Sequence, residues 1–183
     1  MQALFISEST LKEFSVISDN VDPKLLESII ETAQNLYIHP VLGTALYKHI
    51  QLQITSGTVS DDYKTLLDDY IQPALVEWVK YEGAPELTIK IGNKSIGKHQ
   101  DEYQQPATLE EIRFIMEHWR NRAEELTTRL RRFLCANTST YTKFTESTDA
   151  NDIHPQTETY FGGMYLGSSL SWKKGRLRDK YQS

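Results

Sequence analysis

The segment from Gly92 to His99 comes closest to a chemical motif in this sequence. It reads Gly-Asn-Lys-Ser-Ile-Gly-Lys-His, follows a strand pattern and nearly matches the phosphate-binding loop G-x-x-x-x-G-K-[ST]. His99, however, stands where the Mg²⁺-binding hydroxyl should be. The polar stretch Gln100–Gln105 and then Pro106 predict no helix whose N-terminus could hold a phosphate. We therefore interpret the segment as a hairpin turn with a basic tip, and we predict no cofactor.

The other reactive side chains do not combine into a recognisable site. Cys135 has no histidine near it in sequence to serve as a base, so we interpret it as a packed thiol. The pairs Asp61-Asp62 and Asp68-Asp69 flank apolar positions of one amphipathic helix, which is typical of a cap and a solvated face. The five histidines lack the spacing of a metal site: His39, His49, His99, His118 and His154. The sequence predicts neither an enzyme nor a metal site, so we assign no catalytic, metal-binding or cofactor-binding residues.

The bulk composition excludes some classes of protein. Acidic residues outnumber basic ones by 25 to 20, for a net charge of −5, which argues against a dedicated duplex-DNA binder. No apolar run approaches the roughly 18 residues of a membrane span, and the N-terminus carries no secretory pattern. A single cysteine allows no internal disulfide. These features indicate synthesis in a reducing cytoplasm, without a membrane partner.

Helical spacing of apolar residues predicts most of the elements that would position any site. The first helix should begin at Asp22-Pro23, where aspartate caps and proline occupies the first turn, and should end at His39-Pro40. A shorter helix should follow Leu42-Gly43-Thr44 and break at Ser56-Gly57-Thr58. A third should start near Ser60-Asp61-Asp62 and kink at Pro73.

The region from Gly83 onward should contain a hairpin and then the longest helix. Alternating residues before and after Gly92-Asn93 predict a small β-hairpin insertion near residues 86–98. Thr108 and Glu111 then predict a capping box. The helix that follows carries a heptad seam, in which we expect Trp119 and Leu126 to be buried against the first and third helices. The seam residues are Leu109, Ile112, Met116, Trp119, Ala123, Leu126, Leu130 and Phe133.

The C-terminal part of the chain has a different composition. Residues 138–159 are rich in Ser, Thr and Asp without an apolar period, which predicts a linker. Residues 160–183 combine aromatic, glycine and basic residues. Five basic residues against one acidic residue give this tail +4, so the remainder of the chain carries −9. The tail could stack on nucleic acid, but we favour a protein-binding arm, because the acidic body of the same protein can receive it.

The sequence thus predicts a mostly α-helical protein: a small helical bundle with one long heptad-patterned helix, a small β-hairpin insertion and an extended C-terminal arm. We expect a helical domain over residues 1–136, and a linker and arm over residues 137–183. The arm residues expected to contact partners are Phe161, Met164, Tyr165, Leu166, Trp172, Lys173, Lys174, Arg176 and Arg178.

The stretch from Leu36 to Ile50 resembles a segment of the head–tail connector proteins of tailed bacteriophages, also called adaptor or ring proteins. It reads Leu-Tyr-Ile-His-Pro-Val-Leu-Gly-Thr-Ala-Leu-Tyr-Lys-His-Ile, a proline-bearing turn, Leu-Gly and a Leu-Tyr helix after an amphipathic helix. The order of elements over about residues 6–136 is also similar to that family. Within it, the chain looks closest to ring proteins of crAss-like phages.

This resemblance implies a structural virion protein without catalytic residues. Such proteins form a closed ring, typically a dodecamer, below the portal and around the DNA channel, and they join capsid to tail. The expected partners are other copies of the chain, the portal protein and further ring, adaptor or tail proteins, with DNA passing through without sequence-specific binding. The expected location is the head–tail junction of the virion, after synthesis in the cytoplasm of the bacterial host. The alternative is a nucleic-acid-associated accessory protein that binds through its basic aromatic tail.

Overall fold

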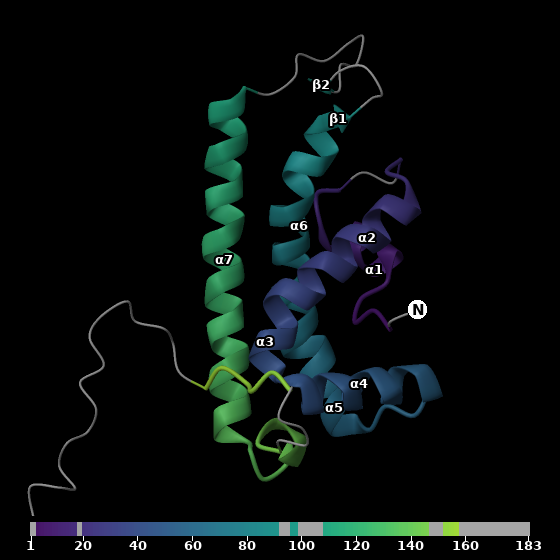
Figure 1. Ribbon diagram of the computed structural model, residues 1–183, viewed down its shortest axis with the longest axis vertical. Coiled ribbons are helices and arrows are strands. Elements are labelled where there is room, and N and C mark those ends of the chain that lie inside the picture. Colours follow the sequence, from purple (N-terminus) through teal and green to yellow (C-terminus); the bar gives the residue numbers. More distant parts are fainter. Residues whose placement is uncertain (1–2, 18–19, 92–95, 99–107, 147–151, 158–183) are drawn as a thin grey trace, which may run out of the picture.

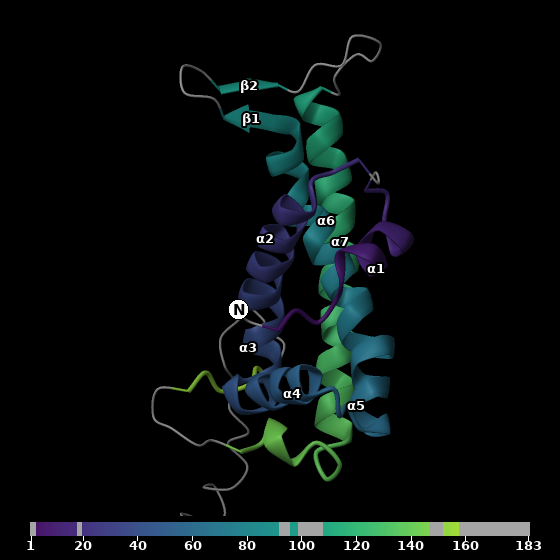
Figure 2. The same cartoon turned by 90° about the vertical axis from the view of Figure 1, so that its right-hand side faces the viewer.

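Two long antiparallel helices, α6 (Gln72–Thr88) and α7 (Leu109–Ala136), run side by side along the molecule (Figures 1 and 2). The computed structural model describes residues 3–17, 20–91, 96–98, 108–146 and 152–157. α2 packs along α6, while α4 and α5 lie at the end of the pair opposite the strands. The remaining elements are α1 (Glu8–Phe14), α2 (Pro23–Ala33), α3 (His39–Leu42), α4 (Thr44–Ser56), α5 (Asp61–Leu66), β1 (Ile89–Ile91), β2 (Ile96–Lys98) and a 3₁₀ turn (Thr142–Phe144). The prediction of a mostly helical bundle is confirmed.

Several helix ends lie where the sequence places them. Thr108 and Glu111 form the predicted capping box, with the Thr108 N–H donating to the Glu111 carboxylate at 2.8 Å and the Glu111 N–H donating to the Thr108 hydroxyl at 3.3 Å. The Asp22 side chain accepts the Lys24 N–H at 3.0 Å, and Gly57 ends α4 in the left-handed region. The sequence did not predict α1, because that short helix contributes Leu11 alone as a buried side chain.

The first predicted helix does not end at His39-Pro40. It widens into the π turn Gln34–Ile38 and continues as α3, with the His39 N–H donating to the carbonyl five residues earlier. In a regular α-helix the ring of Pro40 would collide with the carbonyl four residues before it, and the wider turn relieves that collision. His39 keeps α-helical angles (φ −55°, ψ −46°), so the predicted helix end was wrong, and the helical path runs on to Leu42.

Pro73, predicted to kink the third helix, stands in the same setting. The π turn Leu67–Ile71 separates α5 from α6, and the Gln72 N–H donates to the carbonyl five residues earlier. Gln34 in the first π turn and Gln72 directly after the second both bond to the N-terminal segment. The buried Gln34 amide accepts the Phe5 N–H at 2.8 Å, and the Gln72 amide donates to the Phe5 carbonyl at 3.3 Å. The N-terminal segment is therefore held against both turns.

The helical pattern does not break at Gly83, as the sequence suggested, because α6 continues to Thr88. Gly83 is buried within α6 and faces Ile29 of α2, so its lack of a side chain fits helix packing rather than a turn. β1 and β2 then pair antiparallel, with Ile91 opposite Ile96. Residues 92–95, which would complete the predicted hairpin, lie outside the described residues, so the hairpin insertion as a unit stays a prediction.

Burial along α7 differs from the predicted seam. Its buried residues are Ala123, Thr127, Leu130 and Leu134. Trp119 and Leu126, which we expected to be buried, are half-buried, while Leu109 is 61% exposed. The buried face of α7 is rotated toward Thr127 relative to the predicted seam. The Thr127 hydroxyl accepts the Trp78 indole N–H at 2.9 Å, and this hydrogen bond lets a polar side chain occupy a core position.

The predicted boundary at residue 136 does not separate a core from a linker. Tyr141 and Phe144 are 3% and 1% exposed and belong to the same hydrophobic core as the helices. The Tyr141 hydroxyl also donates to the Asp62 carbonyl at 2.9 Å. Two aromatic side chains in a polar stretch leave no apolar period, which is why the sequence pattern suggested a linker. Residues 137–146 are part of the packed domain.

Candidate interaction site

The predicted partner-binding residues of the arm cannot be placed, because Phe161 to Arg178 lie outside the described residues. The same holds for His99 and for residues 92–95 of the near-match to a phosphate-binding loop. The described stretch nearest to the arm is residues 152–157. It lies across the junction of α3 and α4 and the lower half of α7 (Figure 1).

Backbone hydrogen bonds fix this stretch to the α3–α4 corner. The Thr44 N–H donates to the Ile153 carbonyl at 2.9 Å, and the Ile153 N–H donates to the Thr44 hydroxyl at 2.9 Å. The Gln156 N–H donates to the Pro40 carbonyl at 3.1 Å, a group whose usual helical partner is absent at the corner. Extended peptides often bind in this way, because main-chain hydrogen bonds supply affinity regardless of side chain. We call residues 152–157 the docked segment and Pro40–Thr44 its corner.

Gly43 makes the close approach possible. Its φ of +74° lies in the region that favours glycine, and this turn reverses the chain from α3 into α4. A Cβ at this position would lie 2.8 Å from the Pro155 Cδ and 3.2 Å from the Ile153 carbonyl oxygen. Any side chain would therefore push the docked segment away. The conformation and the contact both require glycine here.

His39 links the corner to its electrostatic surroundings. Its Nε2 lies 3.0 Å from the Thr44 hydroxyl, and its ring stacks on Tyr47 at 4.3 Å between ring centroids. Burial, followed by the positive charge of Lys48, lowers the pKa of His39, while Asp152 opposes that shift. In the neutral form Nε2 can accept the Thr44 hydroxyl proton, which leaves the hydroxyl oxygen to accept the Ile153 N–H. The docked arrangement therefore favours neutral His39.

The end of the docked segment contacts α7. The Arg131 guanidinium lies 3.5 Å from the Gln156 side-chain oxygen, and the Cys135 thiol lies 3.8 Å from the Thr157 carbonyl. Cys135 is exposed, which differs from the packed thiol expected from the sequence. These contacts fix the point at which the chain leaves the described structure, on one flank of the lower half of α7.

Among the remaining candidate groups, His154 belongs to the docked segment, and the others lie on separate elements. His49 bonds to Gln53 at 2.9 Å, while His118 and His154 are exposed. Asp61 and Asp62 occupy the first turn of α5, whose N-cap residue is Ser60, so the expected capping role of this pair was wrong. Within residues 3–17, 20–91, 96–98, 108–146 and 152–157, no three His, Cys, Asp or Glu side chains gather closely enough to hold a metal ion. No helix in this described part is long and apolar enough to span a membrane.

The sequence pattern included the corner residues but did not predict that they bind the docked segment. Leu42-Gly43-Thr44 was interpreted as a helix boundary, and the glycine was the available signal of a close approach. Ile153 and Pro155 gave no pattern, because the docked segment binds mainly through its backbone. A partner that uses main-chain atoms leaves little trace in sequence periodicity.

The chain matches one known family, and the match spans the corner. The matched region runs over residues 38–153, more than half of the 183 residues, and it crosses the predicted domain boundary at residue 136. No curated protein and no solved structure matches the chain. The match begins at Ile38, beside the corner, and ends at Ile153, which bonds to it. The chain belongs to the family described as DUF6712, a family of unknown function.

Proposed function

We propose that this protein is a structural virion component, a head–tail connector that forms a ring below the portal of a tailed phage. Its copies bind one another side by side, the portal protein on one side and a further ring or tail component on the other. A dodecamer is the expected assembly, with DNA passing through its centre. The protein acts by assembly rather than by catalysis.

The observation that carries the proposal is the α3–α4 corner. The stretch Leu36–Ile50, which resembles the connector family, forms the surface that receives the docked segment. The local roles of Gly43 and Thr44 suit such a segment, since glycine allows the approach of Pro155 and Thr44 forms two hydrogen bonds with Ile153. The corner would thus serve to anchor the root of an arm.

The distribution of charge and of apolar surface supports assembly. Residues 1–159 carry −9 against +4 for the tail, so the body of one copy attracts the tail of another. An acidic body around the channel would also keep passing DNA from adhering. In this proposal the hairpin insertion begins after α6, at residues 89–98, and residues 160–183 extend outside the protomer.

The proposal is tested by incorporation into virions. Phages that encode the full chain and phages that encode a chain lacking Tyr160–Ser183 are produced, and purified particles are analysed by quantitative mass spectrometry. We expect the full chain at a fixed ring stoichiometry and the shortened chain at background level. Absence of the full chain from intact virions would contradict the connector function itself. Normal incorporation of the shortened chain would contradict the role of the arm.

The nucleic-acid alternative predicts a different behaviour of the purified protein. A DNA-binding tail should hold duplex or single-stranded DNA at low salt and lose it steeply as salt rises. A ring protein of this kind should bind little DNA at any salt concentration. Fluorescence anisotropy with labelled DNA, measured across a salt series, separates the two functions.

A further inference from the structure

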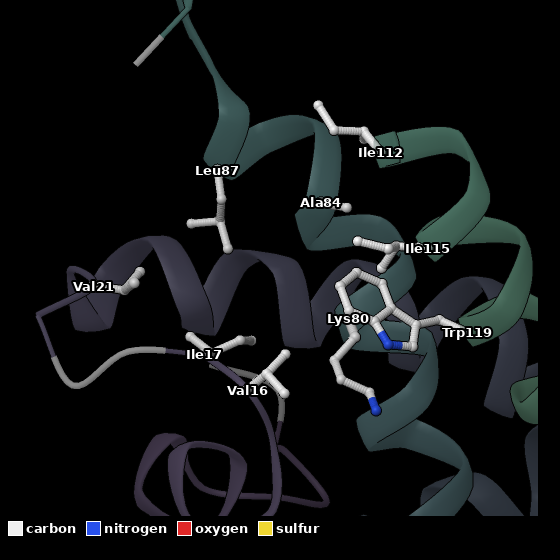
Figure 3. A pocket seen from close by; sticks show the side chains of 9 residues that line it. All are labelled: Val16, Ile17, Val21, Lys80, Ala84, Leu87, Ile112, Ile115 and Trp119. Atoms are coloured by element: carbon white, nitrogen blue, oxygen red, sulfur yellow. The ribbon is translucent and has the colours of Figure 1, made fainter. Parts of the chain in front are cut away.

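One side of the α6–α7 pair carries two neighbouring hollows with mainly apolar linings. The upper hollow, about 260 Å³, lies nearer the strands. Three elements surround it: α6, α7 and the segment that follows α1. Ile17, Leu87 and Ile115 approach it from these three elements (Figure 3). The lower hollow, about 520 Å³, has Phe14 of α1 and Leu126 of α7 in its lining. We call this side the α1–α7 face.

Large apolar side chains on this face lie in solvent. Phe14 is 67% exposed, Val16 is 77% exposed and Ile115 is 41% exposed. No other part of the described chain covers them. An exposed group of apolar side chains around a concave surface is typical of a binding site for another protein segment.

An ion cluster around a buried carboxylate separates the two hollows, with its Arg122 side chain exposed. The Glu77 carboxylate, in a residue 5% exposed, lies 2.5 Å from the Lys80 ammonium and 3.3 Å from the Arg122 guanidinium. The Lys80 ammonium also lies 5.7 Å from the centroid of the Trp119 ring. Asp68 adds a second carboxylate to the lining of the lower hollow, so two carboxylates and two cations balance around this cluster. An apolar segment suits the two hollows, since their linings are mainly apolar.

The chain leaves the described structure on the opposite flank. The docked segment ends beside Cys135, nine positions after Leu126, and at about 100° per residue these side chains leave α7 in directions about 180° apart. Figure 2 likewise shows α1 and the docked segment on opposite sides of the α6–α7 pair. In a ring, each subunit presents two different faces to its two neighbours. The exit of one copy would then lie next to the α1–α7 face of the next.

We propose that the α1–α7 face binds residues 160–172 of a neighbouring copy of this chain. Phe161, four positions after the docked segment, supplies an apolar side chain for the lower hollow, which lies nearer the exit, and Leu166 supplies one for the upper hollow. The nine residues from 158 to 166, extended at about 3.3 Å per residue, reach about 30 Å. This matches the rise of about 30 Å along α7 between Cys135, at the exit, and Ile115, in the upper hollow. This inference rests on the proposed ring, because the ring places a neighbouring copy beside this face.

The test traps the contact as a disulfide between full-length chains, all in a Cys135→Ser background. One chain carries Val16→Cys, a second carries Leu166→Cys, and the matched control carries Leu52→Cys. Leu52 lies on α4, outside this face, and is 68% exposed, close to the 77% of Val16, so neither substitution removes core packing. Equal mixtures are oxidised gently, and intact mass spectrometry follows the mixed dimers. Circular dichroism checks the fold of each chain.

We expect the Val16→Cys and Leu166→Cys chains to cross-link at least about tenfold faster than the Leu52→Cys and Leu166→Cys chains, because binding raises the effective concentration of the two thiols. Equal rates for the two mixtures would overturn the proposal. A chain with both Val16→Cys and Leu166→Cys that closes an internal disulfide, without mixed dimers in the first experiment, would also overturn it by assigning the face to its own tail. Since purified protein is used, failure here is distinguishable from failure to enter virions.

Discussion

The two halves of α7 carry the same apolar pattern but have different surroundings. In the lower half, Ala123, Leu130 and Leu134 are fully buried, and α6, the 137–146 segment and the docked segment lie around them. In the upper half, Leu109 and Ile115 are 61% and 41% exposed, and Ile115 lines the upper hollow of the α1–α7 face. A heptad seam therefore identifies an apolar surface without identifying what covers it. The lower half is completed by the chain itself, and we propose that the upper half is completed by a neighbour.

The largest expected effect is on the free energy of unfolding, and it compares a buried leucine of α7 with an exposed one. Leu130→Ala should lower the free energy of unfolding by about 2–5 kcal/mol, because it removes a fully buried side chain and leaves a cavity. Leu109→Ala, at an exposed position of the same helix, should stay within about 0.5 kcal/mol of the original chain. Urea unfolding followed by circular dichroism measures both. Equal losses would contradict the assignment of the core to the lower half.

The next effect concerns closure of the lower half by the docked segment. Gly43→Ala should cost about 1–3 kcal/mol, through the positive φ and through the collision with Pro155. Gly57→Ala is the matched control, since its φ is +67° and no atom lies near the added methyl group. Hydrogen exchange should show loss of protection at the Ile153 amide in Gly43→Ala alone. Retained protection there would show that the corner tolerates a side chain.

A smaller effect should appear with pH, again in the lower half. The pKa of His39 is lowered in the folded chain from about 6.5, so its contribution to stability is present above pH 6.5 and is lost as pH falls through the folded pKa. Protonated Nε2 can only donate to Thr44, so the Thr44 hydroxyl proton would lose His39 as its acceptor and would have to turn away from the ring. Lys48 and Asp152 also face this group.

Amide protection of Ile153 and Gln156 should therefore fall between about pH 7.5 and pH 5, after correction for intrinsic exchange. Amides in the upper half of α7 serve as internal references. His39→Gln should remove the pH dependence, because glutamine does not titrate. Protection that is constant with pH in the original chain would show that His39 does not control docking.

The last prediction is that removal of metal ions has no effect on the fold. The sequence offers no ligand set with the spacing of a metal site, so a chelator should leave the circular dichroism spectrum and the thermal midpoint of the purified protein unchanged. Incubation with ATP and GTP should release no phosphate. Unfolding on chelation, in either half, would overturn the view that packing alone holds the protein together.

Apolar periodicity and helix caps predicted much of the fold. They did not predict contacts between segments that are distant in the sequence. Thr108, Glu111 and Gly57 signal helix ends through local chemistry, and the structure places those ends accordingly. The path through Pro40 could not be predicted, because the π turn that accommodates proline has no clear sequence signature. Tyr141 and Phe144 were missed, since two buried aromatic residues make no period. The corner depends on hydrogen bonds between Thr44 and Ile153, two residues over one hundred positions apart, and the bond from the Thr44 N–H to the Ile153 carbonyl joins backbone atoms alone.

The central claim is that this protein forms a ring at a head–tail junction. Electron cryomicroscopy of purified virions tests it most directly, because the antiparallel α6–α7 pair should be recognisable in rod-like density. We expect a closed ring below the portal, with one such pair in each subunit and additional density along each α1–α7 face. A junction that is fully accounted for by other proteins, with no density that fits this fold, would contradict the claim.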